Sequence, residues 1–145
     1  MRHRMAVAVL SLVGLLVSTY LLLFKLGVLG GIACGGSGGC ERVATSPWAV
    51  LFGVPVAAYG VAGYLVLMGV ALVGLGERWL RRAEPTRWLV VLSGIGVLFA
   101  IYLTYLEAAV IHAWCRWCVT SAILITLIFA TSFAGARGFR REPAR

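Results

Sequence analysis

Four cysteines in two pairs are the residues of this sequence best suited to chemistry. Cys34 and Cys40 flank a segment with four glycines, whereas Cys115 and Cys118 form a Cys-x-x-Cys motif. A thiolate attacks a disulfide through a mixed-disulfide intermediate, so two dithiols that meet can pass electrons from one pair to the other. The flexible glycine-rich spacing lets the first pair reach different partners. We therefore take thiol–disulfide exchange as the first hypothesis.

The second pair stands where an apolar helix is expected to begin. On a helix, Cys115 and Cys118 share one face, because residues three apart are neighbours there. The positive end of the helix dipole stabilises a thiolate at the first of the two positions, and Arg116 adds positive charge nearby. These features predict a reactive dithiol.

Other uses of the cysteines remain open at this point. Buried cysteines can act as small apolar residues, and four thiolates can bind zinc or an iron–sulfur cluster. The glycines make the first pair a poor preformed set of ligands, and His112 is the only histidine near the second pair. We expect no metal. The alternative is a non-enzymatic membrane protein with a structural four-cysteine metal site or structural disulfides.

Long apolar segments must position the cysteines. The 145 residues are 61% hydrophobic, with a mean hydropathy of +0.97. Four uncharged stretches are long enough for a spanning helix, which needs about 20 residues, and helices satisfy their own backbone groups in lipid. We predict a single all-α membrane domain over 1–145. It is a four-transmembrane-helix bundle with helices near 5–26, 54–75, 86–110 and 113–133, an outer loop 27–53, a cytoplasmic loop 76–87 and a basic tail 134–145.

The outer loop contains signals for one further element. Ser46 is a good helix N-cap, and Pro47 suits the first helical position. Pro55 divides the uncharged stretch 43–76, because an interior proline breaks or kinks a helix. We therefore expect a short interfacial helix over 47–53, before the second spanning helix.

The net charge of +8 is distributed unevenly along the chain. Ten of the thirteen basic residues fall in 2–4, 78–87 and 137–145, and the other three are Lys25, Arg42 and Arg116. The side with more basic residues is normally cytoplasmic. We expect both termini in the cytoplasm and all four cysteines on the outer side, where disulfides persist. This pattern argues against nucleic-acid binding.

A dithiol at the membrane surface needs an electron acceptor that dissolves in the membrane. A quinone takes up two electrons and diffuses within the bilayer. We therefore expect a quinone, either ubiquinone or menaquinone, as the cofactor.

Several segments together resemble the bacterial form of the vitamin K epoxide reductase family, and the resemblance covers nearly the whole chain. The two cysteine pairs in this order, with Ser-Pro six residues after the second cysteine, are jointly specific. The matching segments are Ile32-Ala33-Cys34, Cys40-Glu41-Arg42-Val43, Thr45-Ser46-Pro47-Trp48, Phe52-Gly53-Val54-Pro55, Tyr102-Leu103-Thr104-Tyr105-Leu106-Glu107 and Cys115-Arg116-Trp117-Cys118.

The resemblance implies a four-helix bundle around a quinone. It implies that Cys34 and Cys40 are a shuttle pair, that Cys115 and Cys118 are the catalytic pair with Cys118 nearest the quinone, and that Ser46 lies near the active site. It also implies an inner-membrane thiol oxidase that accepts electrons from a separate periplasmic thioredoxin-like protein. Such an enzyme supports disulfide formation in exported proteins.

Other residues near the expected site have weaker claims. We expect Phe52 to form an apolar wall of the quinone pocket, and Tyr59 and Tyr105 to offer hydroxyls to a quinone carbonyl. Interface anchoring or core packing is the alternative for both tyrosines. Glu107 and His112 could handle protons or simply be solvated at the membrane boundary. The sequence does not assign a role to either.

Overall fold

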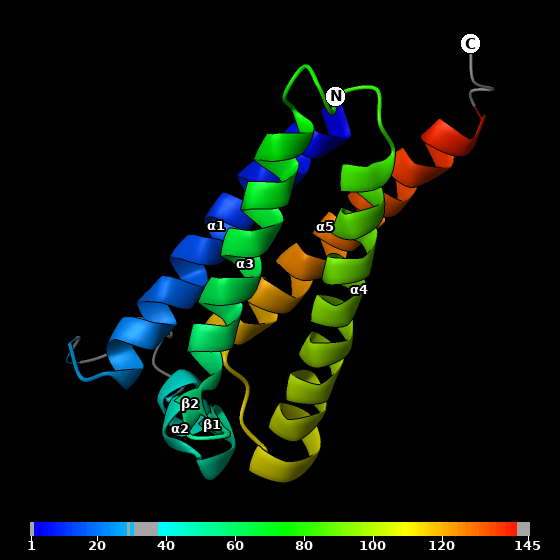
Figure 1. Ribbon diagram of the computed structural model, residues 1–145. Coiled ribbons are helices and arrows are strands. Elements are labelled where there is room, and N and C mark those ends of the chain that lie inside the picture. The colour runs from blue at the N-terminus through cyan, green and yellow to red at the C-terminus, as the bar shows by residue number, and fades with distance from the viewer. Residues whose placement is uncertain (1, 29, 31–37, 142–145) are drawn as a thin grey trace.

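The computed structural model describes residues 2–28, 30 and 38–141. Four long helices in this part of the chain form an antiparallel bundle (Figure 1), namely α1 (Arg2–Lys25), α3 (Val56–Gly74), α4 (Glu84–Tyr105) and α5 (Arg116–Arg141). A π-helical turn, η2 (Leu106–Ile111), extends α4. All four are long and apolar enough to cross a membrane. The prediction of an all-α membrane bundle is confirmed.

The bundle packs through small residues that face large ones. Helix α1 contacts α3 and α5, and α4 contacts α3 and α5 in turn. A Cβ atom at Gly14 would overlap the ring of Tyr64, and one at Gly60 would lie 2.8 Å from the Ser18 hydroxyl. These glycines let the helices approach closely, as is common in membranes. The largest buried cluster is formed by Val7, Tyr64, Leu67, Ala71, Leu89, Ile125 and Ile128.

One end of the bundle is held together by a buried arginine. The guanidinium of Arg4 donates to the carbonyl oxygens of Gly74, of Trp79 at 3.0 Å and of Arg82 at 2.6 Å. It also bonds the Thr86 hydroxyl, and the residue is only 1% exposed. Arg4 is therefore more than a solvated, orientation-setting charge, because it fastens α1 to the connection between α3 and α4.

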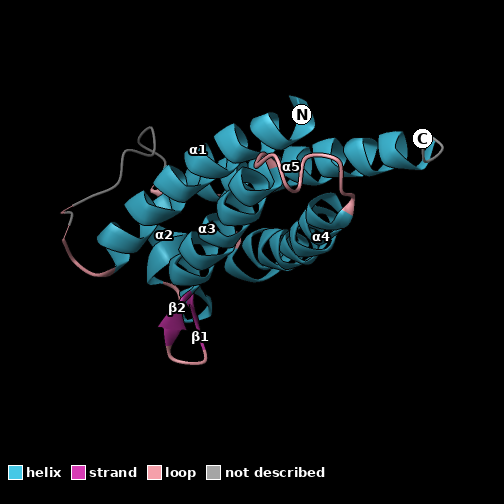
Figure 2. Cartoon of the chain, turned by 45° about the horizontal axis from the view of Figure 1, so that its top comes forward, coloured by secondary structure: helices cyan, strands magenta, loops and turns pink. Residues whose placement is uncertain are grey.

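The opposite end contains three short elements before α3 (Figure 2). They are α2 (Gly39–Thr45), the 3-10 turn η1 (Pro47–Ala49), and a hairpin whose strands β1 (Val50–Leu51) and β2 (Val54–Pro55) pair antiparallel. Figure 1 shows these elements far from the start of α1 and the end of α5. The bundle therefore separates the basic ends of the chain from the segment around Cys40.

The predicted interfacial helix over 47–53 is too long. Only Pro47–Ala49 is helical, and the following residues form the hairpin. Phe52 and Gly53 have φ angles of 52° and 76°, and two consecutive positive values make the two-residue turn that suits a twisted hairpin. An aromatic residue in this conformation is uncommon, so the sequence does not predict a hairpin turn at Phe52.

Both ends of the last helix, α5, also differ from the predicted bounds 113–133. The helix begins at Arg116 instead of near 113, because His112 takes a left-handed conformation (φ 55°) and residues 112–115 are irregular. It continues to Arg141, so most of the predicted basic tail over 134–145 is helical within the described residues. The later start makes Cys115 the residue that immediately precedes the helix.

Candidate functional site

Two cysteines that are distant in the sequence meet in one buried cluster. Cys40 on α2 is 0% exposed and Cys115 is 1% exposed, and the two pack together with Cys118 beside them. Cys40 is disulfide-bonded, whereas Cys115 and Cys118 are free thiols. Cys34, the other predicted shuttle residue, lies outside the described residues. The arrangement brings a disulfide sulfur against a dithiol.

Helix α2 is fixed on both sides so that Cys40 faces this cluster. At its start, Gly39 packs so tightly on the Trp114 carbonyl oxygen that a Cβ atom would overlap it. At its end, the Lys25 ammonium donates to the Ala44 carbonyl at 2.9 Å. Short helices are marginal on their own, so these tertiary contacts are what hold α2 in place.

Ser46 stands between two short elements, because it is the C-cap of α2 and the N-cap of η1. Its hydroxyl donates to the Val43 carbonyl at 2.7 Å, and it makes no side-chain cap bond to η1. Ser46 therefore occupies the expected N-cap position, and its carbonyl accepts Ala49 N–H at 3.1 Å, but its side chain does not cap; Pro47 occupies the first position of η1. Ser46 still lies in the wall of the cavity described below.

Cys115 acts as the N-cap of α5. Its carbonyl accepts the first helical hydrogen bond, from Val119 N–H at 3.0 Å, and its sulfur accepts the Cys118 N–H at 3.4 Å. The pKa of Cys115 is lowered, first by a hydrogen bond from the Cys118 thiol and then by backbone N–H groups of Cys118 and Trp117. Burial and the charge of Glu107 oppose this shift without cancelling it. Cys115 is thus the thiol that ionises more readily than an ordinary cysteine.

Glu107 lies directly beside the dithiol. It is 4% exposed, it sits on the π-helical turn η2, and its carboxylate accepts the Cys115 backbone N–H at 3.3 Å. Its carbonyl accepts Ala113 N–H at 3.1 Å, which closes the turn around the left-handed His112. π-helical turns are frequent at functional sites. The side chain of His112, by contrast, is exposed and outside the cavity.

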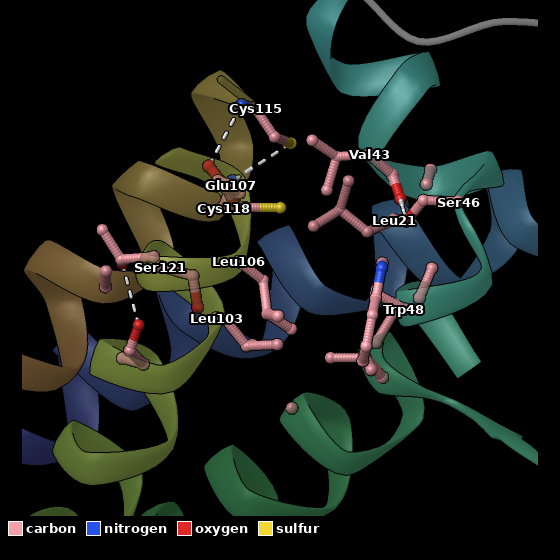
Figure 3. A pocket seen from close by; sticks show the side chains of 18 of the residues that line it. Leu21, Val43, Ser46, Trp48, Leu103, Leu106, Glu107, Cys115, Cys118 and Ser121 are labelled. Carbon is pink, nitrogen blue, oxygen red and sulfur yellow. Dashed lines mark hydrogen bonds between the residues drawn. The ribbon is translucent and has the colours of Figure 1, made fainter. Parts of the chain in front are cut away.

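A cavity of about 150 Å³ opens next to the dithiol (Figure 3). Helices α1, α3, α4 and α5 and the segment 43–49 contribute to its walls, which are mainly apolar. Figure 3 shows the Cys118 sulfur pointing from α5 toward the centre of this space. Apolar walls with a few placed polar groups are typical of cofactor pockets. The polar side chains in the wall are Ser18, Lys25, Ser46, Trp48, Thr104, Glu107, Cys115, Cys118 and Ser121.

The structure brings some of the predicted pocket residues together and leaves others outside. Cys118 and Ser46 line the cavity. Phe52 is 92% exposed at the hairpin turn, and Tyr105 is 63% exposed on the outside of α4. Tyr59 also lies outside the cavity wall, and its hydroxyl donates to the Leu51 carbonyl at 3.0 Å.

Sequence reasoning missed several residues that do line the cavity. The sequence marks Trp48 only as part of a segment that resembles the family, and Lys25 only as part of the charge pattern, yet both lie in the wall. Ser121 also lines the cavity, and the Tyr64 hydroxyl holds it in place. The Tyr64 oxygen lies 2.9 Å from both the hydroxyl oxygen and the carbonyl oxygen of Ser121. No sequence signal marks Ser121, because only the assembled bundle brings Tyr64 on α3 within reach of Ser121 on α5.

A metal centre finds no support in this geometry. Within residues 2–28, 30 and 38–141, no group of three or more His, Cys, Asp and Glu side chains could hold a metal ion. Cys40 is engaged in a disulfide, so its sulfur is not a free thiolate ligand. The described part of the site therefore fits thiol exchange better than metal binding.

Comparison with known protein families gives a match that spans most of the chain. Residues 5–133 match the sequence model described as the Vitamin K epoxide reductase family. The matched range includes all four cysteines and every residue that lines the cavity. The chain therefore belongs to the vitamin K epoxide reductase family and is a multi-pass membrane protein of this group of quinone-linked disulfide oxidoreductases.

Proposed function

We propose that this protein is a thiol oxidase that passes electrons from a periplasmic thioredoxin-like protein to a membrane quinone. In this role it supports disulfide formation in exported proteins. The observation that carries the proposal is the contact between buried Cys40 and Cys115, beside a cavity into which Cys118 points. This contact links the outer segment of the chain to the apolar pocket.

The first half of the reaction is a pair of thiol exchanges. A partner thiolate attacks Cys34 of a Cys34–Cys40 disulfide and releases Cys40, which attacks Cys115 of the Cys115–Cys118 disulfide. The partner's second thiol then frees Cys34, and Cys34 attacks Cys40 and releases Cys115. The lowered pKa of Cys115 suits this last step, because a more acidic thiol leaves faster.

The second half oxidises the reduced Cys115–Cys118 pair. A quinone in the cavity, either ubiquinone or menaquinone, would accept two electrons and two protons. Cys118 faces the space where it would bind, and apolar side chains such as Leu103 and Leu106 exclude water from the ring. Closure of the Cys115–Cys118 disulfide returns the site to its starting state.

We propose the inner membrane as the location, with one membrane domain over 1–145. The ten basic residues outside the cysteine-bearing end support cytoplasmic termini. The same orientation exposes the segment around Cys40 to the periplasm, where a separate thioredoxin-like protein could reach it.

Quinone reduction by the purified protein tests the proposal. With dithiothreitol as the electron donor, the wild type should reduce a short-chain ubiquinone or menaquinone, followed by absorbance. Cys118→Ser should abolish this turnover, whereas Thr120→Ala, an exposed change on the same helical turn, should not. Four unreactive thiols that retain a stoichiometric metal would instead support a structural metal site.

A further inference from the structure

We propose that Glu107 is a further catalytic residue, which carries a proton from the Cys118 thiol to the reduced quinone. This inference rests on the proposed function. It assigns a chemical role to a side chain that the thiol exchanges themselves do not use.

The position of Glu107 is unusual for a carboxyl group. It belongs to an apolar segment long enough to cross a membrane, Glu84–Ile111, and it is 4% exposed. Among the described residues, the ion pair found joins Arg87 to Glu84, so Glu107 has no cationic partner there. A buried carboxyl without a counter-charge is costly, and such groups inside membranes usually serve a function.

The contacts of Glu107 point to the dithiol. One carboxylate oxygen accepts the backbone N–H of Cys115 at 3.3 Å. The carboxyl also neighbours the Cys118 thiol, and the two groups influence each other's ionisation. Figure 3 shows Glu107 and Cys118 side by side at the edge of the cavity. One acid–base group therefore touches both the thiol and the wall of the proposed quinone site.

Few other groups in the cavity could move this proton. The titratable side chains in its wall are Lys25 from α1, Glu107 from η2, and Cys115 and Cys118 at the start of α5. The Lys25 ammonium is bound to the Ala44 carbonyl on the α2 side. Segment 43–49 and the walls from α3 and α4 add only hydroxyl, indole and apolar groups.

The proton balance needs such a carrier. Oxidation of the dithiol breaks two S–H bonds, forms one S–S bond and releases two electrons and two protons, and the quinone becomes a quinol with two O–H bonds. Glu107 as carboxylate would take the proton of Cys118 while the S–S bond forms, and would then deliver it to an unprotonated oxygen of the reduced quinone, which becomes one of the two O–H groups of the quinol. The second proton comes from Cys115, directly or after exchange with water. Glu107 ends as carboxylate, so nothing else is consumed.

Glu107→Gln separates this role from a structural one. Glutamine keeps an oxygen for the Cys115 N–H but cannot hold a proton. We expect the rate of dithiothreitol-driven quinone reduction to fall about 100-fold, within the range typical of lost acid–base catalysis. Reduction of the Cys115–Cys118 disulfide without quinone, followed by alkylation, should stay as fast as in the wild type. Glu41→Gln, an exposed change of equal charge, is the control.

Two further measurements keep the test independent of folding. Glu107→Asp retains a carboxyl and should keep the wild-type shape of the rate–pH profile at a lower rate. Glu107→Gln should lose the part of this profile in which the rate rises as Glu107 loses its proton. In a Cys118→Ser background, Glu107→Gln should move the ionisation of Cys115 to lower pH, because a neighbouring negative charge is removed. An unchanged Cys115 profile would show that Glu107 is never a carboxylate there, and would overturn the proposal.

The outcomes distinguish the two proposals. If Glu107→Gln reduces quinone at the wild-type rate and with the wild-type pH profile, the role of Glu107 is refuted and the oxidase function stands. If the wild type itself reduces no quinone, both proposals fail.

Discussion

The backbone of Gly39 rests on the carbonyl oxygen of Trp114, with no room for a side chain between them. This single approach joins the helix that carries Cys40 to the residue before Cys115. This glycine therefore sets how closely the two sulfur-bearing segments approach, and the packing of Cys40 on Cys115 depends on that approach. Several measurements can test this arrangement and the chemistry built on it.

Gly39→Ala should uncouple the two cysteine pairs. The new methyl group must push α2 away from Trp114, and Cys40 moves with it. Because a displacement of about 1 Å can reduce a rate on the order of 100-fold, partner-driven turnover should fall steeply. Quinone reduction driven by dithiothreitol should remain, because a small dithiol reaches Cys115–Cys118 directly. Gly63→Ala on α3, where no atom lies within 4 Å, is the matched control.

Cys118→Ser should trap the intermediate between the pairs. Cys115 then lacks its neighbouring thiol, but Cys40 still packs against it. We expect a Cys40–Cys115 disulfide to accumulate under oxidising conditions, identified by mass spectrometry of the digested protein. Adding Gly39→Ala to this variant should reduce the trapped fraction. Equal trapping in both would show that Gly39 does not position Cys40.

The partner should bind covalently through Cys34. A thioredoxin-like protein whose second active-site cysteine is replaced by Ala can attack but cannot be released. It should form a mixed disulfide with the wild type, and Cys34→Ala should eliminate it while keeping some dithiothreitol-driven activity. A trapped complex mapped to Cys40 would reverse the assignment of the shuttle pair.

Ionisation of Cys115 should depend on a donor at position 118. Cys118→Ser keeps a hydroxyl that can donate to the Cys115 sulfur, whereas Cys118→Ala removes the donor. The lowered pKa means that Cys115 stays thiolate, and reactive, to lower pH than an ordinary thiol with a pKa of about 8.5. The alkylation rate of Cys115 should thus begin to rise at lower pH in Cys118→Ser than in Cys118→Ala. Coinciding profiles would remove this explanation of the acidity of Cys115.

Arg4→Ala should destabilise the bundle from the end opposite the site. The change removes the donor from the carbonyl oxygens of Gly74 and Arg82, whereas the Trp79 carbonyl keeps the Arg82 N–H at 3.0 Å. Each unsatisfied buried acceptor costs about 1–3 kcal/mol, so the combined loss of unfolding free energy should be several kcal/mol. Thermal unfolding in detergent measures it, with the exposed Arg2→Ala as control. Equal melting temperatures for both variants would contradict the proposed role of Arg4 in joining α1 to the connection between α3 and α4.

The sequence predicted the parts of the fold that depend on long-range averages. Twenty apolar residues in a row indicate a spanning helix whatever they pack against, so the four long helices were predictable. The hairpin was not, because it depends on Phe52 adopting a positive φ, which few aromatic residues do. Helix α2 was missed for a related reason: a seven-residue helix next to glycines is stable only through tertiary contacts.

The candidate site also has features that the sequence predicts and features that only packing determines. Cysteine spacing indicated thiol exchange, but only packing could bring Cys40 against Cys115. The burial of Glu107 depends on a π-helical turn and a left-handed His112, neither of which has a reliable sequence signal. Phe52 and Tyr105 were expected in the pocket but are exposed. An aromatic residue that is close to a site in the sequence need not face that site in the structure.

The buried guanidinium of Arg4 also constrains how the protein is made. Arg4 leaves the ribosome well before its acceptors at Gly74 and Thr86, which lie 70 and 82 positions later in the chain. When the first helix inserts, this charge has no acceptor within the chain and must stay among water and lipid headgroups. Final docking of the first helix therefore waits for the second and third. A chain that fails to insert them would keep an unsatisfied cation on its first helix, and this cation would distinguish an incompletely assembled protein.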